Sequence, residues 1–173
     1  ADSVKIKQHG GPSDCSAKIR MAWDKDHFYL AAEVTDNKHH QKESGFQCWS
    51  GDCIQLAFRA GPPGRSHGFD GTEFEVGLTL APAGPMLFQW TPGRRALDTG
   101  KMAIVRKGNI SRYEAAVLWS DLGVRPALLP GPVTWSITVN DNDGEGFRGW
   151  LEWTPGICGG KDSSAFGWLR FKE

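Results

Sequence analysis

Hydrophobic and polar residues alternate along much of this chain with a period of two, which is typical of strands that bury one face. The cleanest run covers residues 133–140, and the run around which the chain is organised covers residues 53–58. There Ile54, Leu56 and Phe58 point to one side, and Gln55 points to the other. We therefore expect the three apolar side chains in the core and the amide of Gln55 on the opposite face of the sheet.

The same alternation recurs between short turns, and almost no segment has a helical period. Residues 24–26 form a turn that joins the first two runs into a hairpin. A single helical turn is expected at 120–123, with Ser120 as its N-cap and Gly123 at its end. The pattern predicts an all-β fold, a two-sheet antiparallel β-sandwich that is jelly-roll-like. The expected strands cover residues 17–23, 28–34, 53–58, 73–80, 86–90, 101–106, 112–117, 133–140 and 167–171.

The composition fits such a fold and limits the partners. The 173 residues include 22 glycines and 10 prolines, and they suffice for one domain, 1–173. The 20 basic and 20 acidic residues cancel and form no basic block, which argues against nucleic acid or a membrane as the partner. The sequence has neither a membrane-spanning apolar run nor a signal peptide, and it begins with Ala1. We expect a monomeric, secreted piece, processed or excised from a longer protein.

Four cysteines fit an oxidising compartment, and their spacing is unlike that of a zinc site. A bridge between Cys48 and Cys53 would brace the loop that holds Trp49. Free buried thiols are the alternative, and the sequence leaves both open. The four are Cys15, Cys48, Cys53 and Cys158.

Eight tryptophans are more than a core of this size needs. Trp23 and Trp135 are in phase with inward-facing residues and are expected in the core. Trp49 instead lies in a polar loop just before Gln55. A sugar ring stacks its apolar C–H face on an indole, while its hydroxyls need directional polar partners. The pairing of Trp49 with Gln55 therefore predicts a sugar-binding site at the entrance of this strand.

Further polar residues share the phase of Gln55. If their strands are neighbours, Gln55, Glu75 and Asn140 form one polar patch, and a solvated sheet face is the alternative. Arg148 can bond sugar hydroxyls or a substrate carboxylate through its planar fork of donors. It can equally pair with Asp141 or with a second aspartate of the same loop.

The loop at residues 141–146 is acidic and rich in glycine. Counted from Asp141, the residues Asp143, Glu145 and Glu152 fall at positions three, five and twelve, close to EF-hand spacing. The strand-like flanks argue against an EF-hand. We expect instead a calcium ion in a sandwich loop, held by Asp141, Asp143 and Glu145, with Asx-turns as the alternative. A second oxygen cluster could form from Asp36, Asn37 and Asp52.

Several collinear segments, from about residue 14 onward, resemble family 9 carbohydrate-binding modules and their relatives in secreted bacterial proteins. No single motif is specific, and the resemblance depends on their order. They are Met21–Asp24 with Phe28–Leu30, Val34–Asp36 with His40–Gln41, Trp49–Leu56, Tyr113–Ala116, Val139–Gly144 and Lys161–Gly167.

The resemblance implies a jelly-roll-like sandwich that binds sugars without cleaving them and often holds structural calcium. In the family, two tryptophans clamp a terminal sugar ring. By motif these are Trp49 and Trp153, with Trp150 as the alternative to the second. Gln55 lies where the family has a Glu or Gln that faces the sugar. Glu75 departs from the pattern, because the family often has an arginine there.

The expected function is a non-catalytic module that binds a polysaccharide or oligosaccharide and targets an attached secreted glycan-active enzyme. Two alternatives remain. A glycoside-cleaving enzyme would use two carboxylates from strands. A haem-binding electron-transfer domain would use methionine and histidine ligands. The candidate groups are Glu33, Glu75 and Glu114 for the enzyme, and Met86 or Met102 with His67 for haem.

Overall fold

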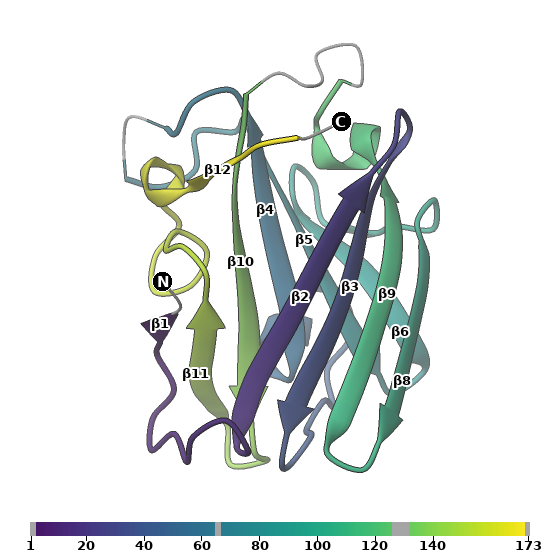
Figure 1. Cartoon of the computed structure of the whole chain (residues 1–173), viewed down its shortest axis with the longest axis vertical. Coiled ribbons are helices and arrows are strands. Elements are labelled where there is room, and N and C mark those ends of the chain that lie inside the picture. The colour runs from purple at the N-terminus through teal and green to yellow at the C-terminus, as the bar shows by residue number, and fades with distance from the viewer. Residues whose placement is uncertain (1–2, 65–66, 126–131, 172–173) are drawn as a thin grey trace.

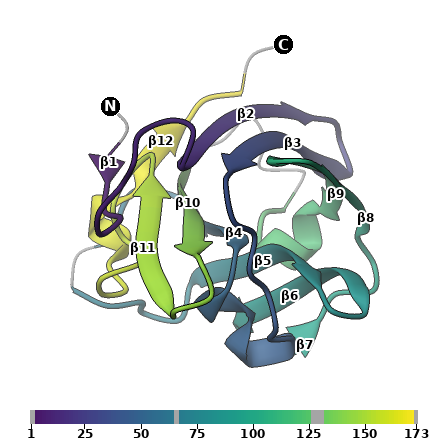
Figure 2. The same ribbon diagram turned by 90° about the horizontal axis from the view of Figure 1, so that it is seen from below.

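The protein is a sandwich of two antiparallel sheets, seen in a computed structural model that describes residues 3–64, 67–125 and 132–171 (Figures 1 and 2). The larger sheet has the order β1-β11-β10-β4-β5-β6-β7, and β12 also pairs with β10. Its strands are β1 Ser3–Val4, β4 Cys53–Ala60, β5 Glu73–Ala81, β6 Gly84–Thr91, β7 Arg95–Ala96, β10 Val133–Asn142, β11 Phe147–Glu152 and β12 Gly167–Leu169.

The smaller sheet has the order β2-β3-β9-β8. Its first two strands form the hairpin that the sequence predicts, and Asp24 closes the turn by accepting hydrogen bonds from the backbone amides of Asp26 and His27 at 2.8 and 2.7 Å. The strands are β2 Cys15–Trp23, β3 His27–Asp36, β8 Lys101–Lys107 and β9 Ile110–Leu118.

The core lies between the sheets and contains the side chains that alternation turned inward. Ile54, Leu56 and Phe58 are fully buried. Trp135 is buried as predicted, and its ring lies 5.9 Å from that of Phe58. Trp23 is only half-buried and packs against the core from the margin. The expected all-β sandwich is therefore confirmed.

The predicted helical turn forms as the 3-10 helix η2, Trp119–Leu122, with one correction. Ser120 is not its N-cap; the cap position is Leu118, two residues earlier, and its side chain makes no capping hydrogen bond. Gly123 ends it as predicted, at a φ of 66° that favours glycine. In the described part of the chain, no helix is long and apolar enough to cross a membrane.

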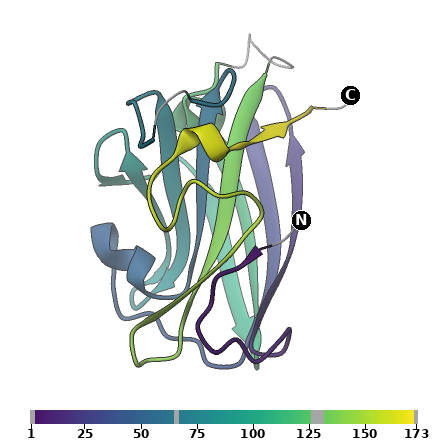
Figure 3. The ribbon, with the colours of Figure 1, turned by 90° about the vertical axis from the view of Figure 1, so that its left-hand side faces the viewer.

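The outer face of the larger sheet is covered rather than solvated. The 3-10 helix η1, Gly45–Ser50, packs on β4 and β5. The segment after β11 runs back over the same face to the short helix η4, Ser163–Ala165 (Figure 3). Its Ile157 and Phe166 pack on Ala57. Loops thus enclose side chains that alternation alone places in solvent.

Candidate functional site

A cavity of about 400 Å³ opens on this outer face, and aromatic and polar groups share its lining. Its aromatic residues are Phe46, Trp49, Trp90, Phe147 and Trp150, and its polar and charged side chains include Gln55, Glu75, Arg94 and Lys161.

The floor of the cavity is a chain of hydrogen bonds across neighbouring strands. Asn140 Nδ2 donates to Gln55 Oε1 at 3.0 Å, and Gln55 Nε2 donates to Glu75 Oε1 at 3.0 Å. Lys161 Nζ completes the chain at 2.5 Å from the same Glu75 oxygen. The structure therefore brings together the three residues expected to share a patch, and buries Gln55 and Glu75 to 3% and 1% exposure, against the solvated alternative. Burial raises the pKa of Glu75, and the ammonium of Lys161 opposes that rise.

Two tryptophans flank this floor from opposite sides. Trp150 belongs to β11 and lies opposite Asn140 in the register, while Trp90 comes from β6, on the far side of β4 and β5. Trp90 lies over Gly77, where a Cβ atom would meet its ring at 2.3 Å. Its Nε1 donates to the carbonyl of Phe46 at 2.8 Å. Gly77 thus makes room for an indole against the sheet.

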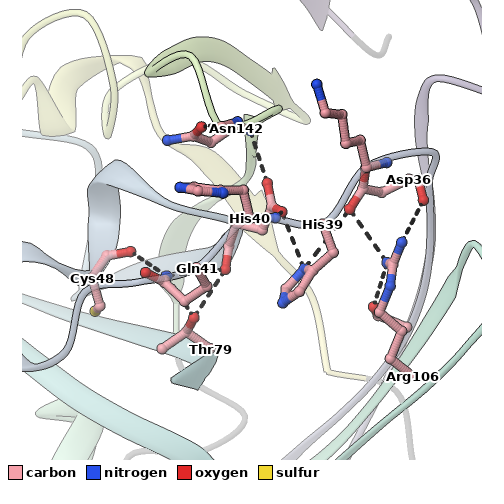
Figure 4. Close-up of polar contacts among 12 residues, drawn as sticks. Asp36, His39, His40, Gln41, Cys48, Thr79, Arg106 and Asn142 are labelled. Atoms are coloured by element: carbon pink, nitrogen blue, oxygen red, sulfur yellow. Dashed lines mark hydrogen bonds and ion pairs between the residues drawn. The ribbon is translucent and has the colours of Figure 1, made fainter. Parts of the chain in front are cut away.

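The loop with Trp49 is held by side-chain amides that donate to its backbone carbonyls rather than by a disulfide. Asn140 Nδ2 donates to the Trp49 carbonyl at 2.7 Å. Gln41 Nε2 donates to the Cys48 carbonyl at 2.9 Å and to Thr79 at 2.8 Å (Figure 4). The Trp49 side chain is 38% exposed and meets Phe147 edge-on, with ring centroids 5.7 Å apart. This indole therefore stands at the mouth of the cavity.

The four cysteines are free thiols in the structure. Cys15, Cys48 and Cys53 are buried, and Cys158 is half-buried in the cavity lining. The thiol of Cys158 donates to Gln55 Oε1 at 3.3 Å. The structure therefore corresponds to the free-thiol alternative rather than to a bridge between Cys48 and Cys53.

Two expected site residues lie outside the cavity. Trp153 lies three residues after Trp150, just beyond the end of β11, so alternation turns it to the other face. It packs on Trp135 with ring centroids 5.2 Å apart. Together with Trp168 it borders a separate, mostly apolar hollow. Arg148 is held by aspartates, at 3.0 Å from Asp141 and with further ion pairs to Asp14 and Asp143.

Sequence reasoning missed Trp90, Arg94 and Lys161. The signal for Trp90 was Gly77, because a glycine inside a strand often marks a close approach by another group. The resemblance leads us to expect an arginine at the position of Glu75. In the structure the positive charge there comes from Lys161 instead. Alternation could not predict the position of Lys161, because it lies in a loop.

A cluster of aspartates lies beyond the Trp49 loop. One carboxylate oxygen from each of Asp36, Asp141 and Asp143 lies within 4.8 Å of the others, and Asp36 also groups with His39 and Asp52. The two oxygen clusters expected from the sequence therefore merge at Asp36, whose contacts with Arg106 and His39 appear in Figure 4.

Two residues expected among the oxygen ligands do not join this cluster. Glu145 is exposed and stands apart. Asn37 donates its side-chain amide to Asp14.

The donors in this cluster fit a hard cation. Oδ1 of Asp141 and Oδ1 of Asp143 are buried without a hydrogen bond, and Oδ2 of Asp141 has only its ion pair with Arg148. Burial raises the pKa of Asp141 to about 7, although Arg148 acts against the rise. Calcium takes carboxylate oxygens as ligands, so Asp36, Asp141 and Asp143 form a suitable set.

The three carboxylates expected of a glycosidase do not meet at one site. Glu33 and Glu114 are diagonal neighbours on the paired strands β3 and β9 of the smaller sheet, away from the cavity. Glu33 pairs with Arg112 at 3.0 Å. Glu75 lies on the outer face of the other sheet. The haem candidates are also apart. Met86 pairs in register with Thr79 near the end of β5, while His67 precedes that strand and pairs with Asp162. Met102 lies on β8, in the smaller sheet.

The β-sandwich and its cavity, with indole side chains beside polar groups, have the chemistry that a protein needs to bind carbohydrate. The chain belongs to the carbohydrate family 9 binding domain-like family, whose sequence model matches residues 2–173. No curated protein matches it.

Solved structures support the same fold. A family 9 carbohydrate-binding module from Caldicellulosiruptor kristjanssonii, in complex with glucose, has a TM-score of 0.69 and 16% identity over 94% of this chain and 80% of its own. Its complex with cellotriose gives 0.69 and 15% over 95% and 79%. A putative carbohydrate-binding protein from Bacteroides uniformis gives 0.64 and 14% over 99% and 84%.

Proposed function

We propose that this protein is a non-catalytic module that holds a sugar ring in the cavity above Gln55 and Glu75. The observation that carries the proposal is the polar floor between indole side chains. The apolar face of a pyranose can stack on Trp49 or Trp150, while its hydroxyls bond to the floor. The structural neighbour solved with glucose and cellotriose supports a saccharide as the ligand.

The polar side chains of the floor have different structural roles. Gln55 and Glu75 hold each other in place, and Lys161 brings ammonium donors to the same point. Asn140 bonds both Gln55 and the Trp49 carbonyl, so it positions the site from below. Stacking with a few such bonds gives a binding free energy on the order of −6 to −8 kcal/mol, which corresponds to micromolar or weaker affinity.

The proposed role of the module is targeting. As a monomeric domain of a secreted protein, it would keep an attached glycan-active enzyme at a polysaccharide, where the tether raises the enzyme's local concentration. Membership in a family of carbohydrate-binding domains supports binding rather than cleavage.

Substitution of the exposed indole tests the proposal. Trp49→Ala should lower affinity for cellotriose at least tenfold in calorimetry, and should leave thermal stability nearly unchanged because the side chain is 38% exposed. Trp168→Ala is the matched control, since that indole is 51% exposed but lies at the other hollow. Equal binding by both variants would remove Trp49 from the site.

We also propose that Asp36, Asp141 and Asp143 hold a structural calcium ion. Oδ1 of Asp141 and Oδ1 of Asp143, which are buried without a hydrogen bond, support the assignment. A bound calcium ion would supply the positive charge that this acidic cluster lacks. Asp36 is the last residue of β3 in the smaller sheet and Asp141 belongs to the larger sheet, so these ligands would tie the two sheets together.

A further inference from the structure

The charges that line the cavity do not balance. Arg94 and Lys161 are positive, and Glu75 is negative. Lys161 Nζ lies 2.5 Å from Glu75, whose side chain is 1% exposed, so these two charges form a pair at the floor. The guanidinium of Arg94 is the charge left over.

Arg94 is held at the rim by its surroundings. It lies between β6 and β7, which pair with each other, and the next residue, Arg95, anchors the turn by donating to Gln89 at 3.0 Å. The guanidinium carbon of Arg94 lies 4.3 Å from the centre of the Phe46 ring, and Phe46 lines the same cavity. Such contact with an aromatic face leaves guanidinium N–H groups free for a second partner.

That second partner is not a carboxylate of the protein. Arg95 has Asp121 at 3.4 Å, but across residues 3–64, 67–125 and 132–171 no ion pair involves Arg94. A neutral sugar would offer this guanidinium only hydroxyls. A planar acidic group would match its paired donors and its charge.

We infer that the cavity takes a saccharide with an acidic substituent, of which a uronic acid is the simplest, and that Arg94 binds that substituent. The inference rests on the proposed sugar site and narrows its ligand class. The ring stacks on the tryptophans, the hydroxyls meet the floor, and the acidic group points to the rim beside Phe46. Arg94 is then the residue that determines specificity.

The test compares ligands that share a ring and differ at one carbon. Calorimetry at low salt measures glucose, glucuronate and glucose 6-sulfate. Glucuronate should bind about tenfold tighter than glucose, since charge-assisted bonds from a guanidinium are strong but partly screened at a rim. This preference should shrink in 0.5 M salt, a concentration at which the screening length falls below about 5 Å. The sulfate ester shows whether the charge alone is sufficient or the planar carboxylate is required.

Three variants assign the effect to one side chain. Arg94→Gln should remove the preference and keep glucose binding, while Arg94→Lys should keep part of it, because an ammonium has the charge without the fork. Arg20→Gln changes the net charge equally on the exposed face of β2 and should bind like wild type.

Equal affinity for glucose and both acidic sugars in wild type would overturn this inference and leave the sugar module intact. A preference that survives in Arg94→Gln would also overturn it. Failure to bind any mono- or oligosaccharide would instead overturn the proposed function itself.

Discussion

Gly77 shows how a residue without a side chain can shape the site. A Cβ atom there would come within 2.3 Å of the Trp90 ring, so the indole owes its place against the sheet to this glycine. Gln55 lies opposite Gly77 in the register, which places the indole beside the polar floor.

Gly77→Ala should therefore weaken sugar binding several-fold by displacing Trp90. Calorimetry with cellotriose, together with tryptophan fluorescence, measures both effects. In a Trp90→Ala background the same substitution should add nothing, because the clash has been removed. An additive loss in the double variant would separate Gly77 from Trp90.

The raised pKa of Asp141 predicts that the stability of the metal-free protein depends on pH. Its pKa is about 7 in the folded state, against an ordinary value of 3.8. Between these values the folded state binds the proton more tightly than the unfolded chain does. The contribution that proton binding at Asp141 makes to the free energy of unfolding is thus fully present below its ordinary pKa, and it is lost as pH rises toward 7.

Urea unfolding in chelator across that pH range measures the change. Wild type should lose stability relative to Asp141→Asn as pH rises, because the amide has no proton to lose. A constant difference between the two proteins would contradict the raised pKa.

Among the elements, the loops at one end of the sandwich carry the calcium proposal. The ligands come from the end of β3 and from the last residues of β10 and the loop beyond, which Arg148 and Arg106 already hold by ion pairs. The cluster still contains more carboxylates than basic side chains, so a bound calcium ion would balance the remaining negative charge.

Calcium at about one hundred times its Kd should raise the free energy of unfolding by about 2.7 kcal/mol. Thermal melts with and without chelator check this. Asp143→Asn should lose the calcium effect, and Glu145→Gln, the matched control in the exposed part of the loop, should keep it. Identical melts of wild type in both conditions would refute the site.

Alternation predicted the strands well, but it did not predict the loops that cover the outer face of the larger sheet. It placed Ile54 inside and Gln55 outside, because both lie within one regular strand. It turns Trp150 and Trp153 to opposite faces, because they are three residues apart, but it did not indicate which of the two faces the cavity. It also did not predict that the residues after β11 return over the outer face, because loops have no hydrophobic periodicity.

At the scale of the whole molecule, the two faces of the larger sheet have different roles. One face builds the core, around Trp135 and Phe58, and the other face carries the cavity. Strand β10 contributes to both, and every one of its residues is buried. Stability and binding can therefore be altered separately through alternate positions of neighbouring strands.

Trp135→Ala should consequently destabilise the fold by about 3–5 kcal/mol, as large aromatic truncations in cores do. Denaturant unfolding measures this loss. In buffer without denaturant, the folded fraction should keep wild-type affinity for cellotriose, because Trp135 does not line the cavity. A variant as stable as wild type would contradict its place in the core.

The half-buried thiol of Cys158 gives this cavity a chemical reporter. Burial raises its pKa to about 11, so alkylation near neutral pH should be slow. The other three sulfhydryls are buried, which leaves Cys158 as the first to react with a maleimide or an iodoacetamide. A saccharide seated above Gln55 would shield that sulfur, so the rate of labelling would report occupancy without any change to the sequence.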